Sequence, residues 1–332
     1  MKGKDNTVLH EELNIHILRI VASIMVVFIH TCAVSINQAE TWNALNLYDS
    51  ISRCSVPVFF MISGYLMLGK GYETMPFYRK RFIRILPPFV FFSALFFVLS
   101  GNGYNIFTFL SRFLNDKIYS HFWFMYILAG IYILFPFING MWKNITKKDK
   151  NILVAIFFII SVLSITKYNL ASLLGLHVSC IWFFILGGWL RDIKLNRALC
   201  LSAYLISSVC IFILTYRIYI ETGQFSQKYY SYTHPLVVIQ AISIFSFINN
   251  INTGTGLRPA WRGILKELSV LSFGVYLIHP IFITGLDKFG YTNSYINPLI
   301  AIPAKALLCY GASLFSIYIM SRIRVLRYFS GV

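Results

Sequence analysis

The sequence predicts an all-α, polytopic membrane protein with about ten transmembrane helices and both termini in the cytoplasm. Hydrophobic residues make up 57% of the 332 residues and charged residues only 12%, whereas soluble domains carry roughly 25% charged residues. The apolar residues form unbroken runs such as FVFFSALFFVL, without the alternation that barrel strands require. Lys and Arg are distributed unevenly between the loops, as is typical of membrane proteins.

Each expected span is close to the roughly 20 apolar residues with which an α-helix crosses a hydrocarbon core. The first span resembles a signal peptide, but its apolar stretch is too long and no small-residue cleavage site follows, so we expect it to remain as an anchor. The second, fifth and sixth are short for transmembrane helices. The ten expected spans are 15–36, 54–69, 82–100, 121–138, 151–166, 173–190, 198–216, 233–249, 268–286 and 298–320.

The basic residues predict the orientation. A cytoplasmic N-terminus places 20 of the 29 Lys and Arg residues in inner segments and 7 in outer loops, with Arg19 and Lys305 inside spans. This bias follows the positive-inside rule and explains most of the net charge of +17. A nucleic-acid partner is not expected, because a basic nucleic-acid-binding surface would lie on a soluble domain. No loop is long enough for a further domain, so residues 1–332 are expected to form one integral-membrane domain.

Motifs for several other chemistries are missing. The sequence has no Cys-x-x-Cys pair, and its His and Cys residues do not show the spacing of a zinc site, so no metal site is expected. Cys32 and Cys54 lie near the outer ends of neighbouring spans and could pair, but buried free thiols are the commoner state. None of the twelve acidic residues falls inside an expected span, which argues against a proton pump or a cation transporter.

Two basic residues of the first span lie on one helical face. Arg19 and His30 are eleven residues apart, which separates them by about 16.5 Å along a helix and by roughly 20° around it. One interpretation is that Arg19 snorkels to the headgroups and His30 makes a structural hydrogen bond. The other is that both belong to one functional site, because ionisable residues at membrane depth mark function by default.

A basic segment, YRKRFIRILPP, opens the third span. Arg81 and Arg84 are three residues apart and therefore face the same way. Positive-inside anchoring is one explanation. The alternative is a phosphate clamp that includes Arg19, because the planar guanidinium group matches phosphate oxygens. A cytoplasmic ligand with phosphates at one end and a long flexible arm would suit this spacing.

Three further residues are weaker candidates for substrate binding. His279 precedes Pro280 within the ninth span, and His121 and Trp123 open the fourth span on its outer side. Helix packing is the alternative for His279, and anchoring in the interfacial aromatic belt is the alternative for Trp123.

Other polar residues have structural explanations. Lys305 is expected to snorkel outward. Asp49 and Arg53 are expected to be solvated residues of the first outer loop, with sugar contact as the alternative. Residues 63–65, Ser-Gly-Tyr, are expected to permit close helix contact.

Five features occur in a characteristic order along the chain. They are the Arg and His separated by ten residues, SVPVFFMISGYLML, RKRFIRILPP, HFWFMYILAGIYILFPFI and SFGVYLIHPIFI. Together they resemble the acyltransferase-3 family of bacterial integral-membrane acyltransferases over nearly the whole chain. The segment SRCSVPVFFMISGYL is most similar to members that O-acetylate enterobacterial common antigen, followed by those that acetylate O-antigen. Many members have Asp where this chain has His16, so His16 is left outside the catalytic set.

The resemblance implies an O-acyltransferase of the bacterial inner membrane. Its donor would be cytoplasmic acetyl-CoA, with no permanently bound cofactor, and its acceptor a hydroxyl of a surface or lipid-linked glycan such as common antigen, O-antigen or exopolysaccharide. The family's intramembrane Arg and His fall on Arg19 and His30, and its basic pair on Arg81 and Arg84. The three arginines would hold the CoA phosphates. His30 would deprotonate the hydroxyl or carry the acetyl group itself.

Two rival functions belong to other classes. A transporter or flippase for a glycan or a small anion would suit the helices and the internal basic residues, but the missing acidic coupling residues and the ordered motifs argue against it. A membrane scaffold would have no use for an intramembrane histidine on the same helical face as Arg19.

Overall fold

The computed structural model describes residues 2–34, 41–101, 105–165, 170–251, 253, 257–289 and 297–332. These residues form helices and no strands, so the all-α prediction is confirmed. The α-helices are α1 (Lys2–Val34), α2 (Trp42–Ser52), α3 (Ser55–Met67), α4 (Thr74–Leu99), α5 (Ile106–Leu114), α6 (Trp123–Asn144), α7 (Lys147–Leu163), α8 (Leu170–Leu190), α9 (Arg197–Thr222), α10 (Pro235–Asn249), α11 (Pro259–Lys288) and α12 (Pro298–Arg322). Short 3-10 helices are η2 (Ser120–Phe122), η3 (Lys228–Tyr230) and η4 (Leu326–Phe329).

Within the described ranges, eight helical segments are long and apolar enough to cross a membrane. The polytopic membrane class is therefore confirmed. The expected fifth and sixth spans correspond to α7, of 17 residues, and to α8, whose described apolar part is Ser179–Leu190. The total of ten spans and their orientation stay predictions.

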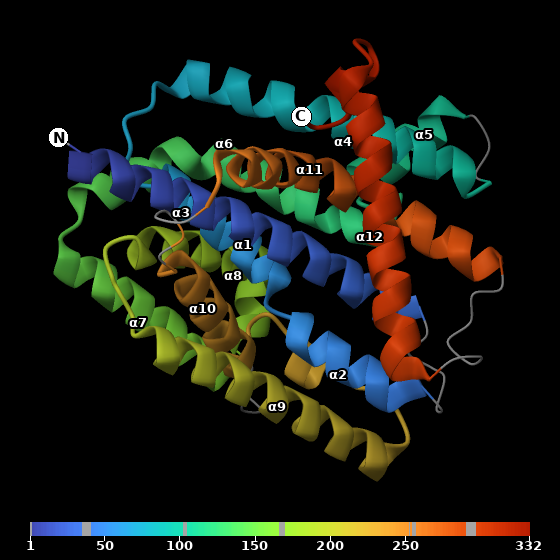
Figure 1. The fold of residues 1–332 in the computed structure, drawn as a ribbon. Helices are drawn as coiled ribbons and strands as arrows, with labels where there is room; N and C mark the ends of the chain where they lie inside the picture. Colours follow the sequence, from blue (N-terminus) through green and yellow to red (C-terminus); the bar gives the residue numbers. More distant parts are fainter. Residues whose placement is uncertain are drawn as a thin grey trace.

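Helix α1 lies at the centre of the bundle (Figure 1). It packs against α2, α3, α10, α11 and α12. Leu18, Ala22 and Val26 recur at helical spacing and join the main hydrophobic core. Because α1 is continuous, Arg19 and His30 lie on one uninterrupted helix, as their spacing predicted.

The second span is longer than the sequence indicates. Only Arg53 and Cys54 separate α2 from α3, and together the two helices form the candidate span Trp42–Met67. We expected the first part of this stretch to be a solvated loop, because polar residues interrupt its hydropathy. These polar residues instead face protein, since α2 packs against α1, α9 and α12. The described cysteines, including Cys32, are free thiols.

Glycines bring α3 and α8 into close contact. A Cβ atom on Gly64 would lie 1.7 Å from the carbonyl oxygen of Phe184, and one on Gly187 would lie 1.9 Å from that of Met61. Small residues let helix backbones approach each other in membranes. The expected close contact at residues 63–65 is therefore confirmed.

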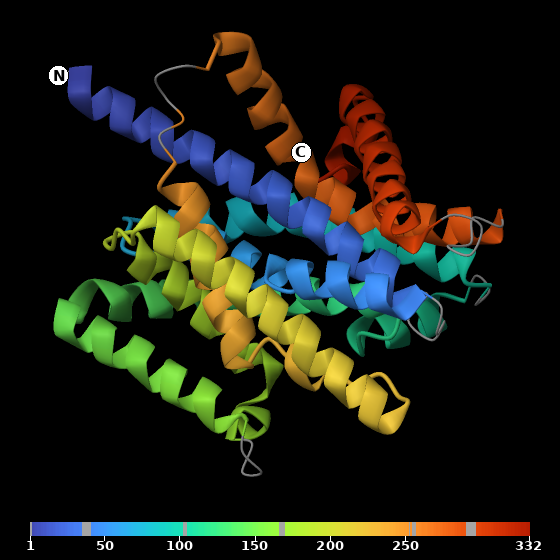
Figure 2. The ribbon, with the colours of Figure 1, turned by 60° about the horizontal axis from the view of Figure 1, so that its bottom comes forward.

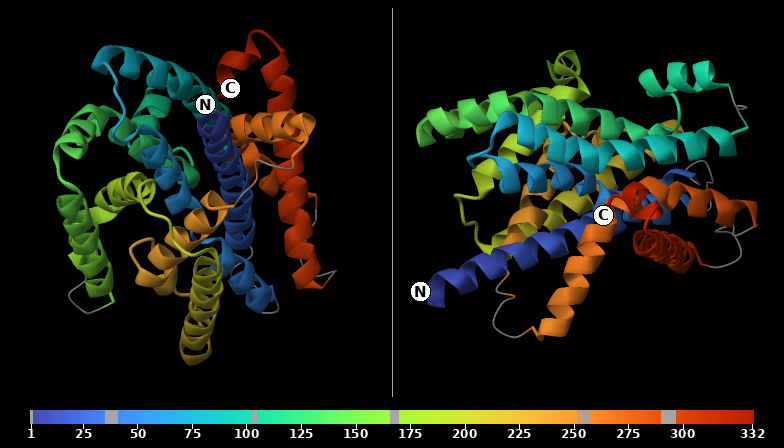
Figure 3. Two further views of the ribbon diagram at one scale, coloured as in Figure 1. Left: turned by 60° about the vertical axis from the view of Figure 1, so that its left-hand side comes forward. Right: turned by 90° about the horizontal axis from the view of Figure 1, so that it is seen from above.

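The remaining helices surround this centre. Figures 2 and 3 show α7 along the outer edge of the bundle, where it packs on α8. A capping box starts α7: the Thr146 hydroxyl accepts from the Asp149 backbone N–H, and the Asp149 carboxylate accepts from that of Thr146. The C-terminal η4 packs against α4, with the rings of Phe91 and Phe329 stacked 4.9 Å apart.

Lys305 does not snorkel outward, so that prediction is wrong. Its side chain is 1% exposed and forms an ion pair with Asp287, which connects α12 to α11. Pairing lowers the cost of burying an ammonium group. The sequence did not indicate this pair because Asp287 lies one residue beyond the expected end of the ninth span.

The contact between α3 and α8 predicts a sharp effect of one methyl group. Gly64→Ala should lower the free energy of unfolding by about 1–3 kcal/mol, because the new Cβ overlaps backbone atoms that cannot move independently. Thermal unfolding of the purified protein in detergent measures this change. Gly130→Ala is the matched control, because a Cβ there meets nothing within 4 Å. Equal stability of the two variants would contradict the prediction.

Candidate active site

A cavity of about 900 Å³, counting its open mouth, lies between α1, α3, α4, α6 and α11. Arg19 of α1 and the pair Arg81 and Arg84 of α4 line it together. The sequence placed the α4 pair on one helical face and suggested convergence with Arg19, and the fold brings all three to one cavity. Apolar and aromatic side chains, including Phe59 and Phe124, form much of the remaining wall.

The three arginines have no carboxylate partner among the residues that the structure describes. The ion pairs formed within the described part of the chain involve none of these guanidinium groups. Arg81 instead lies 5.7 Å from the ring centre of Tyr132, which also lines the cavity. Three like charges in one cavity repel each other, and the repulsion is stronger where water is partly excluded. The cavity is therefore suited to an anion that carries several negative charges.

His16 lies one turn before Arg19 on α1. Its Nδ1 atom is 2.9 Å from the hydroxyl oxygen of Ser269, a residue of α11 that lines the cavity. The position at which many members of the resembling family have Asp thus contacts a hydroxyl group on α11.

Three histidines meet near the other end of α1. The ring centre of His30 lies 5.0 Å from that of His279 on α11 and 6.2 Å from that of His121 in η2. His121 and His279 are 5.5 Å apart and both are buried. Among the described residues, no group of three His, Cys, Asp or Glu side chains is placed to hold a metal ion. Imidazole exchanges protons readily near neutral pH, so the cluster is suited to proton transfer.

The cavity reaches the edge of this histidine cluster. Tyr276 lines the cavity, and its ring centre lies 5.5 Å from that of His121 and 6.1 Å from that of His279. The Tyr276 hydroxyl also donates a hydrogen bond to the His121 carbonyl. Along α1 the lining extends from Arg19 to Val26, which is about one turn short of His30. The cavity thus runs from the arginines to Tyr276, which contacts the histidine cluster, and none of the three histidines is among its lining residues.

Trp123 follows His121 by two residues along the chain. It begins α6, directly after η2, which holds His121. Its half-buried ring has its centre 5.9 Å from that of Tyr232 and 6.4 Å from that of Phe124. These contacts place Trp123 within the aromatic packing around the site.

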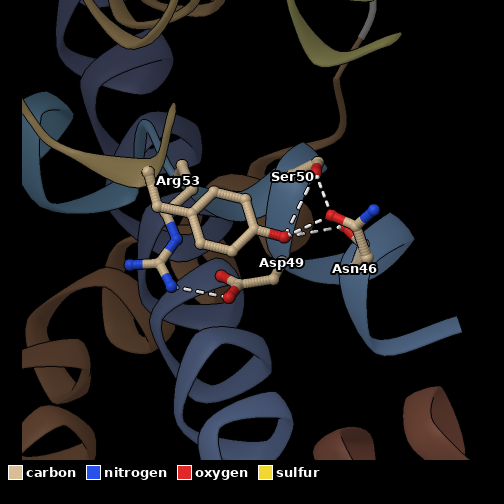
Figure 4. Close-up of polar contacts among 5 residues, drawn as sticks. Asn46, Asp49, Ser50 and Arg53 are labelled. Atoms are coloured by element: carbon tan, nitrogen blue, oxygen red, sulfur yellow. Dashed lines mark hydrogen bonds and ion pairs between the residues drawn. The ribbon is translucent and has the colours of Figure 1, made fainter. Parts of the chain in front are cut away.

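Asp49 is buried and Arg53 is largely buried, so their prediction as solvated loop residues is wrong. The Asp49 side chain is 1% exposed and pairs with the guanidinium group of Arg53 (Figure 4). That group also lies 4.3 Å from the ring centre of Tyr230, whose hydroxyl donates to the Asn46 side chain. Asp49 lies in a candidate span, which contradicts the expectation that no acidic residue does. Because Arg53 balances its charge, the pair is neutral overall.

The acyltransferase-3 family model, described as an acyltransferase domain, matches residues 12–322. The chain belongs to the acyltransferase-3 family. No curated protein and no solved structure matches it. The matched range of the acyltransferase contains the three arginines, the histidine cluster and Trp123. The acidic residue Asp49 within a candidate span weakens the argument that a transporter's acidic residues are missing. The assignment as a membrane acyltransferase therefore rests on family membership.

Proposed function

We propose that this acyltransferase moves an acetyl group from acetyl-CoA to a hydroxyl of a cell-surface or lipid-linked glycan. The observation that carries the proposal is a cavity that holds three arginines, with no carboxylate partner among the described residues, and that ends at Tyr276 beside the histidine cluster. Coenzyme A has the complementary form, with phosphate groups at one end and the thioester at the end of a long arm. Family membership supports acyl transfer, and the chemistry of the cavity supports this donor.

The arginine end of the cavity suits the CoA phosphates. Guanidinium groups form paired, charge-assisted hydrogen bonds with phosphate oxygens, and Arg19, Arg81 and Arg84 offer three such groups. From Arg19 to His30, α1 rises by about 16.5 Å, which is comparable to the reach of the pantetheine arm. Apolar wall residues such as Val26 and Phe59 suit the uncharged part of that arm.

The histidine end supplies the chemistry. His30 takes the proton of the acceptor hydroxyl while the hydroxyl oxygen attacks the thioester carbonyl carbon. A carbon–oxygen bond forms, the carbon–sulfur bond breaks, and the departing thiolate receives the proton from His30. In an alternative route, a nitrogen of His30 first takes the acetyl group and then passes it to the hydroxyl. Both routes need an imidazole beside the thioester, and they differ only in the intermediate.

The positive-inside bias supports the direction of the reaction. It places the arginine end at the cytoplasm, where acetyl-CoA is supplied, and the histidine end toward the outer half of the membrane. A glycan acceptor would therefore approach from the side opposite the donor. A bacterial inner membrane, with O-antigen, common antigen or exopolysaccharide outside it, fits this arrangement.

Removing one guanidinium group from the cavity should weaken donor binding. Arg84→Met or Arg81→Met should raise the KM for acetyl-CoA roughly 10- to 100-fold, because a hydrogen bond between charged groups contributes about 1.5–3 kcal/mol. Steady-state kinetics in membrane vesicles measure this change. Arg79→Met removes the same charge from the same segment, but Arg79 is exposed and lies outside the cavity. Similar KM values for all three variants would argue against a phosphate site.

His30 is the residue on which acyl transfer should depend most. Inverted membrane vesicles are incubated with labelled acetyl-CoA, and the label is followed into glycan or lipid-linked material. His30→Gln should reduce the transfer rate by about 100-fold or more, because general acid–base catalysis contributes about 10²- to 10⁴-fold.

The control is that His30→Gln is inserted in the membrane and elutes as a folded protein in detergent. Transfer at the wild-type rate by this variant would overturn both routes. The absence of transfer by the wild-type protein, with acceptor extracts supplied, would favour a transporter. Mass spectrometry of surface polysaccharides from cells with and without the gene identifies the acceptor by the mass of one acetyl group.

A further inference from the structure

A proline shapes the environment of His279. Pro280 follows His279 inside α11, and proline has no backbone N–H group. The carbonyl of Tyr276, four residues before Pro280, therefore loses its usual helical donor. The Nδ1 atom of His279 lies 2.7 Å from this carbonyl oxygen. The side chain of His279 thus replaces the hydrogen bond that Pro280 cannot make.

This hydrogen bond determines which nitrogen of His279 carries the hydrogen. A carbonyl oxygen can only accept, so Nδ1 must be the donor, and in a neutral imidazole Nε2 is then the acceptor with a free lone pair. Nε2 is buried and has no hydrogen-bond partner among the described residues. Leaving a buried acceptor unpaired destabilises the fold, and such atoms call for an explanation.

The neighbours of His279 supply that explanation. An N–H···N hydrogen bond of about 2.9 Å between two imidazoles places their ring centres about 5 Å apart. The ring centres of His30 and His279 are 5.0 Å apart and their planes are tilted by 48°. The separation of the two rings is therefore the one that a hydrogen bond between a nitrogen of His30 and Nε2 requires.

We propose that His279 is a positioning residue that acts through His30 as the second station of a proton relay. This inference rests on the proposed function. When one nitrogen of His30 takes the proton of the acceptor hydroxyl, its other nitrogen gives its own proton to Nε2 of His279. His279 then carries a hydrogen on both nitrogens, with Nδ1 still bound to the Tyr276 carbonyl. After the carbon–sulfur bond breaks, the proton returns through His30 to the thiolate, so atoms and charges balance.

The relay predicts a kinetic signature for His279→Asn. The Asn side chain can still donate to the Tyr276 carbonyl, but it has no atom in place of Nε2. With acetyl-CoA as the donor, kcat should fall by about 100-fold, while the KM for acetyl-CoA stays at its wild-type value. In mixtures of light and heavy water, the rate should depend on two transferred protons in the wild type and on one in the variant.

His234→Asn is the matched control. His234 is also buried, and its Nδ1 accepts from the backbone of Leu236 at the start of α10, a cap that Asn can replace. This variant should keep the wild-type kcat and the two-proton dependence. Thermal unfolding in detergent checks that both variants are folded.

Two outcomes would overturn the relay. One is a His279→Asn variant with a kcat close to wild type, and the other is a reduced kcat with the two-proton dependence retained. If His279→Asn does not fold, Pro280→Ala replaces it, because the restored N–H competes with Nδ1 for the Tyr276 carbonyl. That variant should lower kcat about 3- to 10-fold, as expected for one hydrogen bond, and an unchanged kcat would then overturn the relay. Loss of transfer in His30→Gln together with full activity in His279→Asn would contradict the relay alone and leave the proposed function intact.

Discussion

Charge inside a membrane protein must be paired or used, and the structure depends on how this constraint is met. Lys305 is buried against Asp287, and Arg53 against Asp49. Each of these pairs connects or stiffens helices and leaves no net charge. Three other arginines are not paired in this way. Arg19, Arg81 and Arg84 share a cavity, and no carboxylate of the described residues lines it or pairs with them. The electrostatic repulsion among these three cations would be relieved by a bound polyanion.

Two helices, α1 and α11, connect the three arginines to the histidine cluster. The unbroken α1 carries Arg19 and His30 on one face and fixes their separation, which the proposed donor spans with its long arm. Helix α11 contributes Tyr276 to the cavity wall and His279 to the histidine cluster. Pro280 removes a backbone hydrogen bond of α11, and the Nδ1–H group of His279 on the same helix replaces it. A single bundle thus places three arginines in one cavity and a histidine cluster just beyond the Tyr276 end of that cavity.

The sequence predicted correctly those features that depend on composition or on the spacing within one helix. Composition determined the membrane class, and the helical repeat placed Arg19 and His30 on one face. Phosphate chemistry suggested that Arg81 and Arg84 meet Arg19. The histidine cluster could not be predicted, because residues 30, 121 and 279 lie on three segments whose packing no spacing encodes.

The incorrect predictions of structure also arose from contacts between helices. Helix α2 was missed because its polar residues, including Asp49, lower the local hydropathy, although they face other helices. The Asp287 partner of Lys305 was missed because it lies just beyond an expected span. Hydropathy predicts which segments can face lipid, whereas these polar residues lie against other helices of the protein. The adjacency of His279 and Pro280 was visible in the sequence, but its meaning required the bond from Nδ1 to the Tyr276 carbonyl.

The most direct test is a structure of the acyltransferase bound to a thioether analogue of acetyl-CoA that cannot be cleaved. We expect the phosphates among Arg19, Arg81 and Arg84, the arm along the cavity past Tyr276, and the acetyl carbonyl beside His30. Phosphates bound elsewhere on the protein, or an acetyl group at the end of the cavity away from His30, would contradict the proposed donor site.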